Sequence, residues 1–348
     1  MSHRPPLSDR QRVDVWDATL HATRSVLRGR GLREVLTPVR LSAVAVEPFI
    51  EPIGAAGGLL ATSPELPMKR LLARGAPSIF QVAPCFRAAE HGDLHREQFH
   101  LVEWYRLDHD ADTMRRDVEA VVAAVFEAVS AALEEPAVAA PSTWIEVSAV
   151  PLMERTLGVS LRGDEDVAAL ADALQPVRGA LGDPLAAVPH EHLVSSPRAH
   201  TLAAWTAFFS TWCDARLDAW LLEQGAVGVH LVEFPTALAA LSEVAPSADG
   251  RQVAHRFESH VSGRELANGY RELRDAAEQR RRFDDVNVLR DAMGLRPLPL
   301  DEAFLSELRE PGLPPCAGVA LGLERLVLLA SARRRLGDVT IELGAPGG

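Results

Sequence analysis

The sequence predicts an α+β fold, a single mixed domain over residues 1–348 with strands in its first and last parts and a helical insert between them. Apolar and polar residues alternate cleanly in "QFHLVEWYRL", residues 98–107, as they do along a strand. Residues 9–31 and 111–134 have instead the repeat of amphipathic helices. The chain shows no internal repeat and no linker, and 47% hydrophobic and 24% charged residues are typical of a folded, soluble protein.

The N-terminal elements are predicted from local signals. Gly29 and Gly31 close the helix at 9–31, because glycine commonly ends a helix, and the strand-like "LREVLTP" follows. Residues 53–60, "IGAAGGLL", have the glycine content of a flexible hairpin or loop.

A short helix is predicted in "TSPELPMKRLLARG", with Ser63 as its N-cap, Pro64 in its first turn and Gly75 as its end. Two strands follow, at about 78–87 and at 98–107, joined by a polar loop. These two strands bring Arg87 close to a strand face that carries Glu103 and Tyr105. This arrangement is unusual for a hairpin that only faces solvent.

That strand face consists of alternate residues. Phe99, Leu101, Glu103 and Tyr105 project to one side, because successive side chains of a strand point to opposite faces. Arg87 stands at the end of the preceding strand. A carboxylate and a phenol among large apolar groups, opposite an arginine, raise the question of a ligand.

The second half of the chain begins with less regular signals. Residues 136–225 are predicted to form the helical insert, with the aromatic residues of "WTAFFSTWCDARLDAWLLEQG" packed in a core. Strands return at 227–234 and around 253–268, and a charged helix follows the Asn-Gly pair at 268–269. "CAGVALGLERLVLLASA" then predicts a strand, a glycine turn and a helix that carries Arg325.

Composition argues against several classes of protein. A net charge of −12 lowers the expectation of nucleic-acid binding. No apolar run approaches the roughly 20 residues of a membrane span, and "MSHRPPLSDRQR" lacks the apolar core of a signal peptide, so we expect a cytosolic protein without a membrane partner. Cys85, Cys213 and Cys316 include no CxxC pair, which fits a reducing compartment. Lys69 is the only lysine; a compositional preference for arginine explains this, and the pattern assigns Lys69 no role.

Common nucleotide and hydrolase motifs are absent from the sequence. There is no GxxxxGK[ST], no GxGxxG between a strand and a helix, no GxSxG and no HExxH, so neither a P-loop nor a Rossmann dinucleotide site is supported. His91 and His95 are four residues apart, and His190 and His192 are two apart. As metal ligands these pairs are weak candidates, because histidines in polar loops are usually solvated.

Three carboxylates near the last strands are harder to explain as plain surface. Glu258 lies in "HRFESH", and Glu265 and Glu272 flank "LANGY". A helix would align Glu265, Asn268 and Glu272, but an Asn-Gly pair is typical of a turn, so we expect the glutamates to project from a strand and a turn. Buried carboxylates need partners. The residues alone leave open a metal ion, a cationic substrate and a structural ion-pair network.

Several segments together resemble a known family. "FRAAEHGDLHREQFHLVEWYR" and "GVALGLERL" resemble motifs 2 and 3 of class II aminoacyl-tRNA synthetases, and "REVLTP", ending at Pro38, resembles the motif 1 that builds their dimer interface. Together with "TSPELPMKRLL" and "FESHVSGRELANGYREL", these segments are similar to the elongation factor P–(R)-β-lysine ligases, which are paralogues of lysyl-tRNA synthetase. The resemblance covers most of the chain except about 136–225.

The resemblance implies a fold and an assembly. The fold is the class II catalytic core, an antiparallel sheet of about six strands flanked by helices, in a homodimer that forms through motif 1. Because motif 1 begins almost at once, we expect no OB domain and no binding of a tRNA anticodon.

The resemblance also implies an ATP-dependent amino acid ligase. Lysine or (R)-β-lysine would attack the α-phosphate of ATP, and a lysine side chain of elongation factor P would then attack the adenylate. Arg87 of motif 2 and Arg325 of motif 3 would be catalytic, and Glu258 and Glu265 would bind Mg²⁺. The residues implied for ATP are Arg87, His95, Phe99, Glu265, Leu266, Gly322 and Arg325. Those implied for the amino acid are Ser63, Pro64, Glu65, Glu103, Tyr105, Asn268, Tyr270, Glu272 and Ala320.

Two of these residues bear on substrate choice. Glu272 would pair with the distal ammonium, and several acids around one small pocket fit a cationic ligand because unpaired buried carboxylates are costly. Ala320 stands where lysyl-tRNA synthetases typically have glycine, which favours (R)-β-lysine. One methyl group discriminates by only about 1–3 kcal/mol.

Alternatives stay open at this point. Taken singly, Ser63 could be a plain N-cap, Tyr105 and Tyr270 core aromatics, and Arg87 the cross-strand partner of Glu103. The family patterns FRNEE and HNPEF read "FRAAE" and "HREQF" here, which removes polar groups beside the nucleotide. The chain could therefore be a ligase that aminoacylates another acceptor, such as a carrier protein or a small amine, or a non-catalytic regulatory paralogue.

Overall fold

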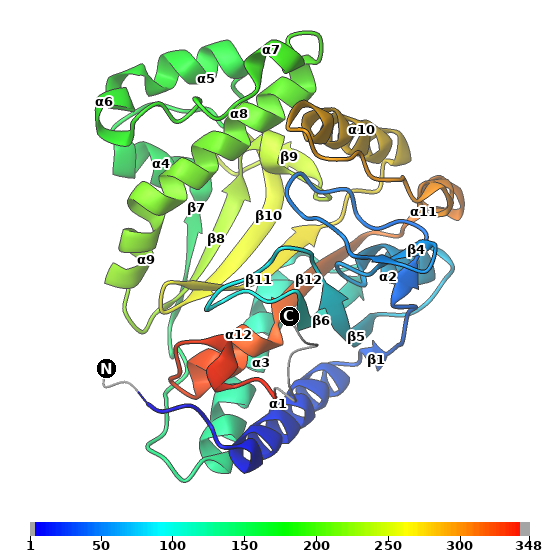
Figure 1. The fold of residues 1–348 in the computed structure, drawn as a ribbon, viewed down its shortest axis with the longest axis vertical. Coiled ribbons are helices and arrows are strands. Elements are labelled where there is room, and N and C mark those ends of the chain that lie inside the picture. Colours follow the sequence, from blue (N-terminus) through cyan, green and yellow to red (C-terminus); the bar gives the residue numbers. More distant parts are fainter. Residues whose placement is uncertain (1–3, 342–348) are drawn as a thin grey trace.

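A large sheet runs through the part of the chain that the structure, a computed structural model, describes, residues 4–341 (Figure 1). Within that part the sheet has nine strands, and β9 lies off the main path beside β10. In spatial order the strands are β1 (Arg33–Glu34), β5 (Ile79–Phe86), β6 (Gln98–Leu107), β12 (Cys316–Gly322), β11 (Arg264–Arg271), β10 (Gln252–Val261), β8 (Gly228–Phe234) and β7 (Trp144–Ser148), with β9 (Val244–Pro246) beside β10.

The direction of the strands confirms the predicted sheet. All neighbours from β5 to β8 are antiparallel, which makes six central antiparallel strands among the described residues. The strands β1 and β7 extend the sheet at its two ends and are parallel to their neighbours. A smaller sheet of β2 (Arg40–Leu41), β3 (Gly54–Ala55) and β4 (Gly58–Leu60) includes the hairpin predicted at 53–60.

Two long helices cover one face of the large sheet. Helix α1 (Asp9–Gly29) begins with a capping box, in which Ser8 and Gln11 satisfy each other's backbone N–H groups. Helix α3 (Ala111–Ala132) packs against α1 and against the central strands. Val102 and Trp104 of β6 are fully buried in this core, so the alternate residues of β6 must face the opposite side of the sheet.

Helix α2 (Glu65–Ala73) starts one residue later than predicted. Pro64, rather than Ser63, is its N-cap, because the N–H of Met68 donates to the carbonyl of Pro64. The Ser63 hydroxyl accepts from the N–H of Glu65 at 3.4 Å, ahead of the helix. The prediction of Ser63 as N-cap was therefore wrong, as was the place of Pro64 in the first turn. Gly75 follows the end of the helix at a φ of +90°, as expected.

The region around Asn268 differs from the prediction of one strand followed by a turn. Residues 252–271 form a hairpin of β10 and β11 that turns at Ser262 and Gly263, both at positive φ. Asn268 and Gly269 lie inside β11, where Asn268 pairs with Glu258. A glycine is needed in this strand because a Cβ at Gly269 would lie 2.4 Å from the Phe257 ring. The charged helix begins only at α10 (Ala276–Ala292).

Most helices of the region 136–225 gather at one end of the molecule (Figure 1). It contributes β7 to the large sheet, so it is not purely helical. Trp205, Phe208 and Trp212 are fully buried within it, which confirms core packing for these aromatics. Its helices are α4 (Ala149–Leu157), α5 (Val167–Leu174), α6 (Arg178–Leu181), α7 (His190–Leu193), α8 (Pro197–Trp212) and α9 (Asp218–Glu223).

The C-terminal part follows the predicted order of strand, glycine and helix. After α11 (Glu302–Glu307), β12 ends at Gly322, which is the N-cap of α12 (Leu323–Ala330). Arg325 lies in the first turn of α12. Among residues 4–341, no helix is both long enough and apolar enough to pass through a membrane. That the whole chain forms one catalytic domain with an insert stays a prediction.

Candidate active site

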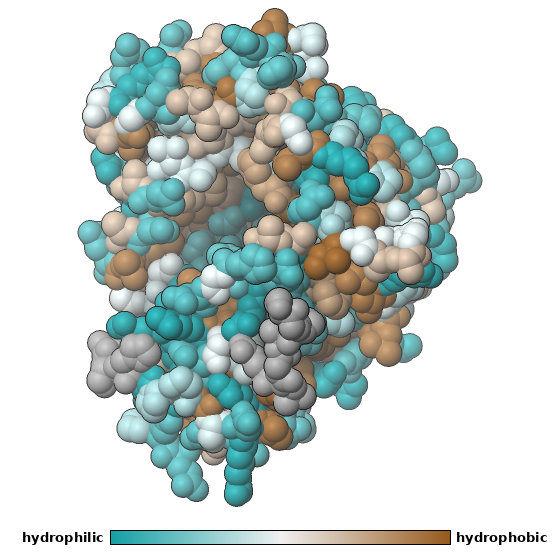
Figure 2. All heavy atoms as spheres, in the orientation of Figure 1, coloured by the Kyte–Doolittle hydropathy of each residue, from teal (hydrophilic) through white to brown (hydrophobic). Residues whose placement is uncertain are grey.

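A cavity of about 230 Å³ opens on the face of the sheet opposite α1 and α3. Figure 2 shows that this side of the molecule is hollowed over the sheet, with hydrophilic residues in the hollow. Residues from β6, β11 and β12 line the cavity, together with the start of α2, the β5–β6 loop and the start of α12. The predicted residues that line it are Ser63, Glu65, Arg87, His95, Phe99, Glu103, Tyr105, Glu265, Leu266, Asn268, Tyr270, Glu272, Ala320, Gly322 and Arg325.

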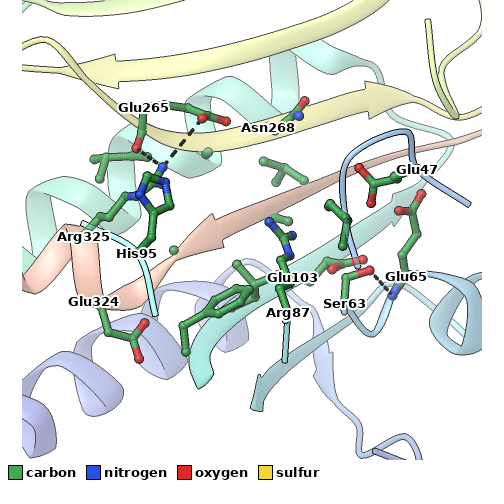
Figure 3. A pocket seen from close by; sticks show the side chains of 18 of the residues that line it. Glu47, Ser63, Glu65, Arg87, His95, Glu103, Glu265, Asn268, Glu324 and Arg325 are labelled. Atoms are coloured by element: carbon green, nitrogen blue, oxygen red, sulfur yellow. Dashed lines mark hydrogen bonds and ion pairs between the residues drawn. The ribbon is translucent and has the colours of Figure 1, made fainter. Parts of the chain in front are cut away.

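The cavity has two chemically different ends, with Arg87 between them (Figure 3). At the carboxylate end, defined by Ser63, Glu65, Glu103, Tyr105 and Glu272, the side chains of Glu103 and Glu272 are almost completely buried. The hydroxyl of Tyr105 donates a short hydrogen bond to the Glu103 carboxylate. Burial, with Glu65 nearby, raises the pKa of Glu103 well above its usual range. This end is therefore short of positive charge.

Lys69 supplies a cation at the carboxylate end. Its ammonium lies 2.6 Å from a carboxylate oxygen of Glu65 and 2.5 Å from one of Glu272, and its side chain is 2% exposed. Burial by itself lowers the pKa of Lys69, but Glu272 and Glu65 outweigh it and the pKa is raised. Lys69, the single lysine of the chain, is thus charged and forms ion pairs with both Glu65 and Glu272.

The other end is defined by His95, Glu265 and Arg325. The guanidinium of Arg325 lies 3.0 Å from the Nε2 of His95 and 3.7 Å from a carboxylate oxygen of Glu265. Burial and the charge of Arg325 lower the pKa of His95, so its ring is neutral near pH 7. Figure 3 shows these three side chains in contact on the side away from Glu65. A positive group and a neutral imidazole are suited to an anionic ligand.

Arg87 lies over the ring of Phe99, with 4.9 Å between its guanidinium carbon and the ring centroid. Its acidic partner is Glu90 at 3.8 Å. A cross-strand pair of Arg87 with Glu103, one structural explanation for both residues, is not found among the hydrogen bonds and ion pairs of the described residues. The Arg87 guanidinium is thus available to a ligand from the cavity.

A family model described as tRNA synthetases class II (D, K and N) matches residues 9–341. An elongation factor P–(R)-β-lysine ligase of Pectobacterium atrosepticum is 34% identical over 91% of this chain and 90% of its own length. Ligases of the same name from Sodalis glossinidius and Vibrio atlanticus are 35% and 32% identical over 89% and 95% of this chain, and 88% and 94% of their own lengths. The chain belongs to this ligase family of the class II synthetases.

Two residues implied by the family pattern do not line the cavity. Pro64 precedes α2, and Glu258 is bound by the guanidinium of Arg256 at 2.6 Å and approached by His260 at 3.5 Å. Glu265 does line the cavity, and the charge of Glu258 adds to burial in raising the pKa of Glu265. Among residues 4–341 no group of three or more His, Cys, Asp or Glu side chains is arranged to hold a metal.

The departures from the family pattern are in contact with each other. The N–H of Ala89, in "FRAAE", donates to the side chain of Glu97, in "HREQF", at 3.0 Å. The N–H of Arg87 donates to the carbonyl of Glu97 at 2.9 Å. Glu97 therefore helps to hold the loop that carries Arg87.

Two charged residues of the cavity region were missed from the sequence. Lys69 was noticed only as the single lysine, although its position four residues after Glu65 on a predicted helix indicated a possible pair. Glu47 lines the cavity near the carboxylate end (Figure 3), but it follows an apolar stretch, residues 43–46, that carries no recognisable motif. Lys69 also pairs with Glu272, and the backbone of Glu47 is held by Arg290; both of these partners are distant in the sequence.

Proposed function

We propose that this chain uses ATP to activate lysine or (R)-β-lysine as an aminoacyl-adenylate, with release of pyrophosphate, and transfers the aminoacyl group to a lysine side chain of elongation factor P, with release of AMP. The observation that carries the proposal is a single cavity with the buried acids Glu103 and Glu272 at one end and Arg325 at the other. A cationic amino acid fits the end with the acids, and a nucleotide fits the end with Arg325. The names of the relatives supply the acceptor protein and the stereochemistry of the amino acid.

The residues of the cavity suit adenylate chemistry. Arg87, between the two ends, would neutralise charge on the α-phosphate while the amino acid carboxylate attacks it, and Arg325 would act on the nucleotide. This reaction requires no protein nucleophile. In agreement, burial raises the pKa of the nearby thiol of Cys85 to about 12, so that it stays protonated.

Mg²⁺ is part of the proposal. Glu265 would hold it together with phosphate oxygens, and Glu258 would join if it exchanged Arg256 for the metal. Mg²⁺ commonly uses one or two carboxylates plus substrate phosphates rather than a cage of protein ligands. The mutual repulsion of the two carboxylates, which raises the pKa of Glu265, is what a bound cation would relieve.

We also propose a cytosolic homodimer that forms through the segment similar to motif 1. Leu36 of this segment is 86% exposed, and Val13 on the neighbouring helix α1 is 57% exposed. Large apolar side chains left in water on adjacent elements are suited to an interface between subunits. No tRNA anticodon is expected to bind, in keeping with the net charge of −12.

ATP–pyrophosphate exchange tests the proposal. Purified protein is assayed with ATP, Mg²⁺ and, in turn, lysine, both β-lysine enantiomers, ornithine and the other standard amino acids. We expect exchange led by (R)-β-lysine, and Arg87→Ala should reduce it about 10²- to 10³-fold, the usual effect of removing one group that stabilises transition-state charge. Exchange followed by failure to label elongation factor P would favour another acceptor. Folded protein without exchange on the whole panel would favour the regulatory paralogue.

A further inference from the structure

Glu47 is an acid beside the carboxylate end of the cavity whose side chain has no partner among residues 4–341. It is partly buried and lines the cavity, and its carboxylate makes no hydrogen bond or ion pair with any described residue. Figure 3 shows it beside Glu65, with both side chains at the same end of the cavity. A carboxylate in this position is exposed to whatever ligand enters.

The backbone around Glu47 is held in place by buried groups. Arg290 of α10 is fully buried and donates to the carbonyl oxygens of Glu47 at 3.0 Å and Ile50 at 3.1 Å. Its guanidinium also lies 2.5 Å from the carboxylate of Glu51. A binding group whose backbone is fixed in this way loses little entropy when a ligand arrives.

The same segment is tied to the loop that carries Arg87. The N–H of Ala88, the residue after Arg87, donates to the carbonyl of Glu51 at 2.7 Å. Among charged side chains, Arg87 also has the largest influence on the pKa of Glu47, which burial raises and Arg87 lowers. The segment of Glu47 is therefore joined to the loop of Arg87, and in the proposed function the reacting carboxylate of the amino acid lies near Arg87.

The other acids at this end already have partners. Glu65 and Glu272 share the ammonium of Lys69, and Glu103 accepts from the hydroxyl of Tyr105. A diamino acid brings two ammonium groups into the cavity, one close to its carboxylate and one at the far end of its side chain. Among residues 4–341, Glu47 is the acid at this end whose carboxylate has no such partner, and its segment is bonded to the loop that carries Arg87.

We propose that Glu47 binds the amino group nearest the reacting carboxylate, the β-amino group of (R)-β-lysine or the α-amino group of lysine, and so determines specificity for diamino acids. The inference rests on the proposed function. It assigns the distal ammonium to the deeper acids, Glu103 and Glu272, and the near one to Glu47. An amino acid without the near amino group would gain nothing from Glu47.

The test compares Glu47→Gln with the wild type on compounds that differ in one amino group. (R)-β-lysine and lysine carry both amino groups, whereas 6-aminohexanoate has the carboxylate and the distal ammonium alone. Exchange gives KM and kcat for the diamino acids, and competition against (R)-β-lysine gives the inhibition constant of 6-aminohexanoate. Glu302→Gln, an exposed glutamate of α11, is the matched control. Glu47→Asp keeps the charge and tests rescue.

We expect Glu47→Gln to raise KM for (R)-β-lysine and lysine about 10- to 100-fold, the usual contribution of a charged hydrogen bond. The inhibition constant of 6-aminohexanoate and KM for ATP should change less than about twofold, and Glu47→Asp should recover part of the loss. An equal loss for all three compounds would show that Glu47 acts on the distal ammonium or on the whole pocket, and would overturn the proposal. A raised KM for ATP, or unchanged KM values, would also overturn it.

Calorimetric binding separates this proposal from the proposed function. If the wild type shows no exchange with any diamino acid, the activity is refuted, but binding of lysine, (R)-β-lysine and 6-aminohexanoate can still be compared in the two proteins. Weaker binding of the two diamino acids alone to Glu47→Gln would support the role of Glu47. Equal binding to both proteins would refute it.

Discussion

Replacing Lys69 by methionine tests the electrostatic core of the carboxylate end. Methionine has a similar length and keeps the apolar contacts of the lysine stem, so the substitution removes mainly the charge. In the wild type that charge is shared by Glu65 and Glu272, whose exposed fractions are only 8% and 1%. The variant therefore leaves two buried acids without their cation.

The expected cost follows from this burial. Removing one partner of a buried ion pair destabilises a protein by about 3–5 kcal/mol, because the remaining charge is uncompensated. Protonation of Glu272 can limit the loss. In the wild type, burial raises the pKa of Glu272 to about 7 although Lys69 lowers it. In the variant, which has no Lys69, the pKa of Glu272 is higher still. Between these two pKa values the variant binds a proton that the folded wild type does not. Each unit of pH decrease in that window reduces the loss by about 1.4 kcal/mol.

Urea unfolding followed by tryptophan fluorescence measures this loss at pH 8.5 and pH 6. Arg70→Met is the matched control, because Arg70 is the next residue of α2 and its pair with Glu307, at 3.0 Å, is partly exposed. We expect the control to lose at most about 1 kcal/mol, with little dependence on pH. A Lys69→Met protein as stable as the control at pH 8.5 would refute the reasoning, as would a loss that grows toward pH 6.

Two further predictions concern the frame around the cavity. Gly269→Ala places a Cβ 2.4 Å from the Phe257 ring and 2.8 Å from the carbonyl of Gly318, so we expect a loss of about 1–3 kcal/mol in denaturant unfolding, and no loss would contradict the close approach. The hydrogen bond with Glu324 raises the pKa of His100. The pair therefore stabilises the fold fully below the unfolded-state pKa of about 6.5. This stabilisation is lost as the pH rises through the higher pKa of the folded state. The stability difference between wild type and His100→Asn should therefore be larger at pH 5.5 than at pH 8.5, and a constant difference would argue against the pair.

Local patterns predicted the elements that carry the cavity. The alternation in "QFHLVEWYRL" marked a strand that the structure places at the same residues, 98–107, with Glu103 and Tyr105 on its cavity face. The strand, glycine and helix around Gly322 were also confirmed. The hairpin of β10 and β11 was missed, because Ser262–Gly263 is a weaker turn signal than Asn268–Gly269. The Phe257 ring leaves no room for a Cβ at position 269, which explains Gly269, and this contact exists only in the folded sheet.

The sequence by itself determined the α+β class, the order of the central elements and most residues of the cavity, because each depends on periodicity or on a motif within one segment. Only the tertiary structure decided how the charges are shared. Lys69 lies on α2 and Glu272 lies beside β12, about two hundred residues later in the chain. The Lys69 ammonium comes within 2.5 Å of a Glu272 carboxylate oxygen only after folding. Glu47 acquires its position from Arg290 and Ala88. Burial and proximity set the pKa of an acid and its freedom to bind a ligand, and both are properties of the fold rather than of any one segment.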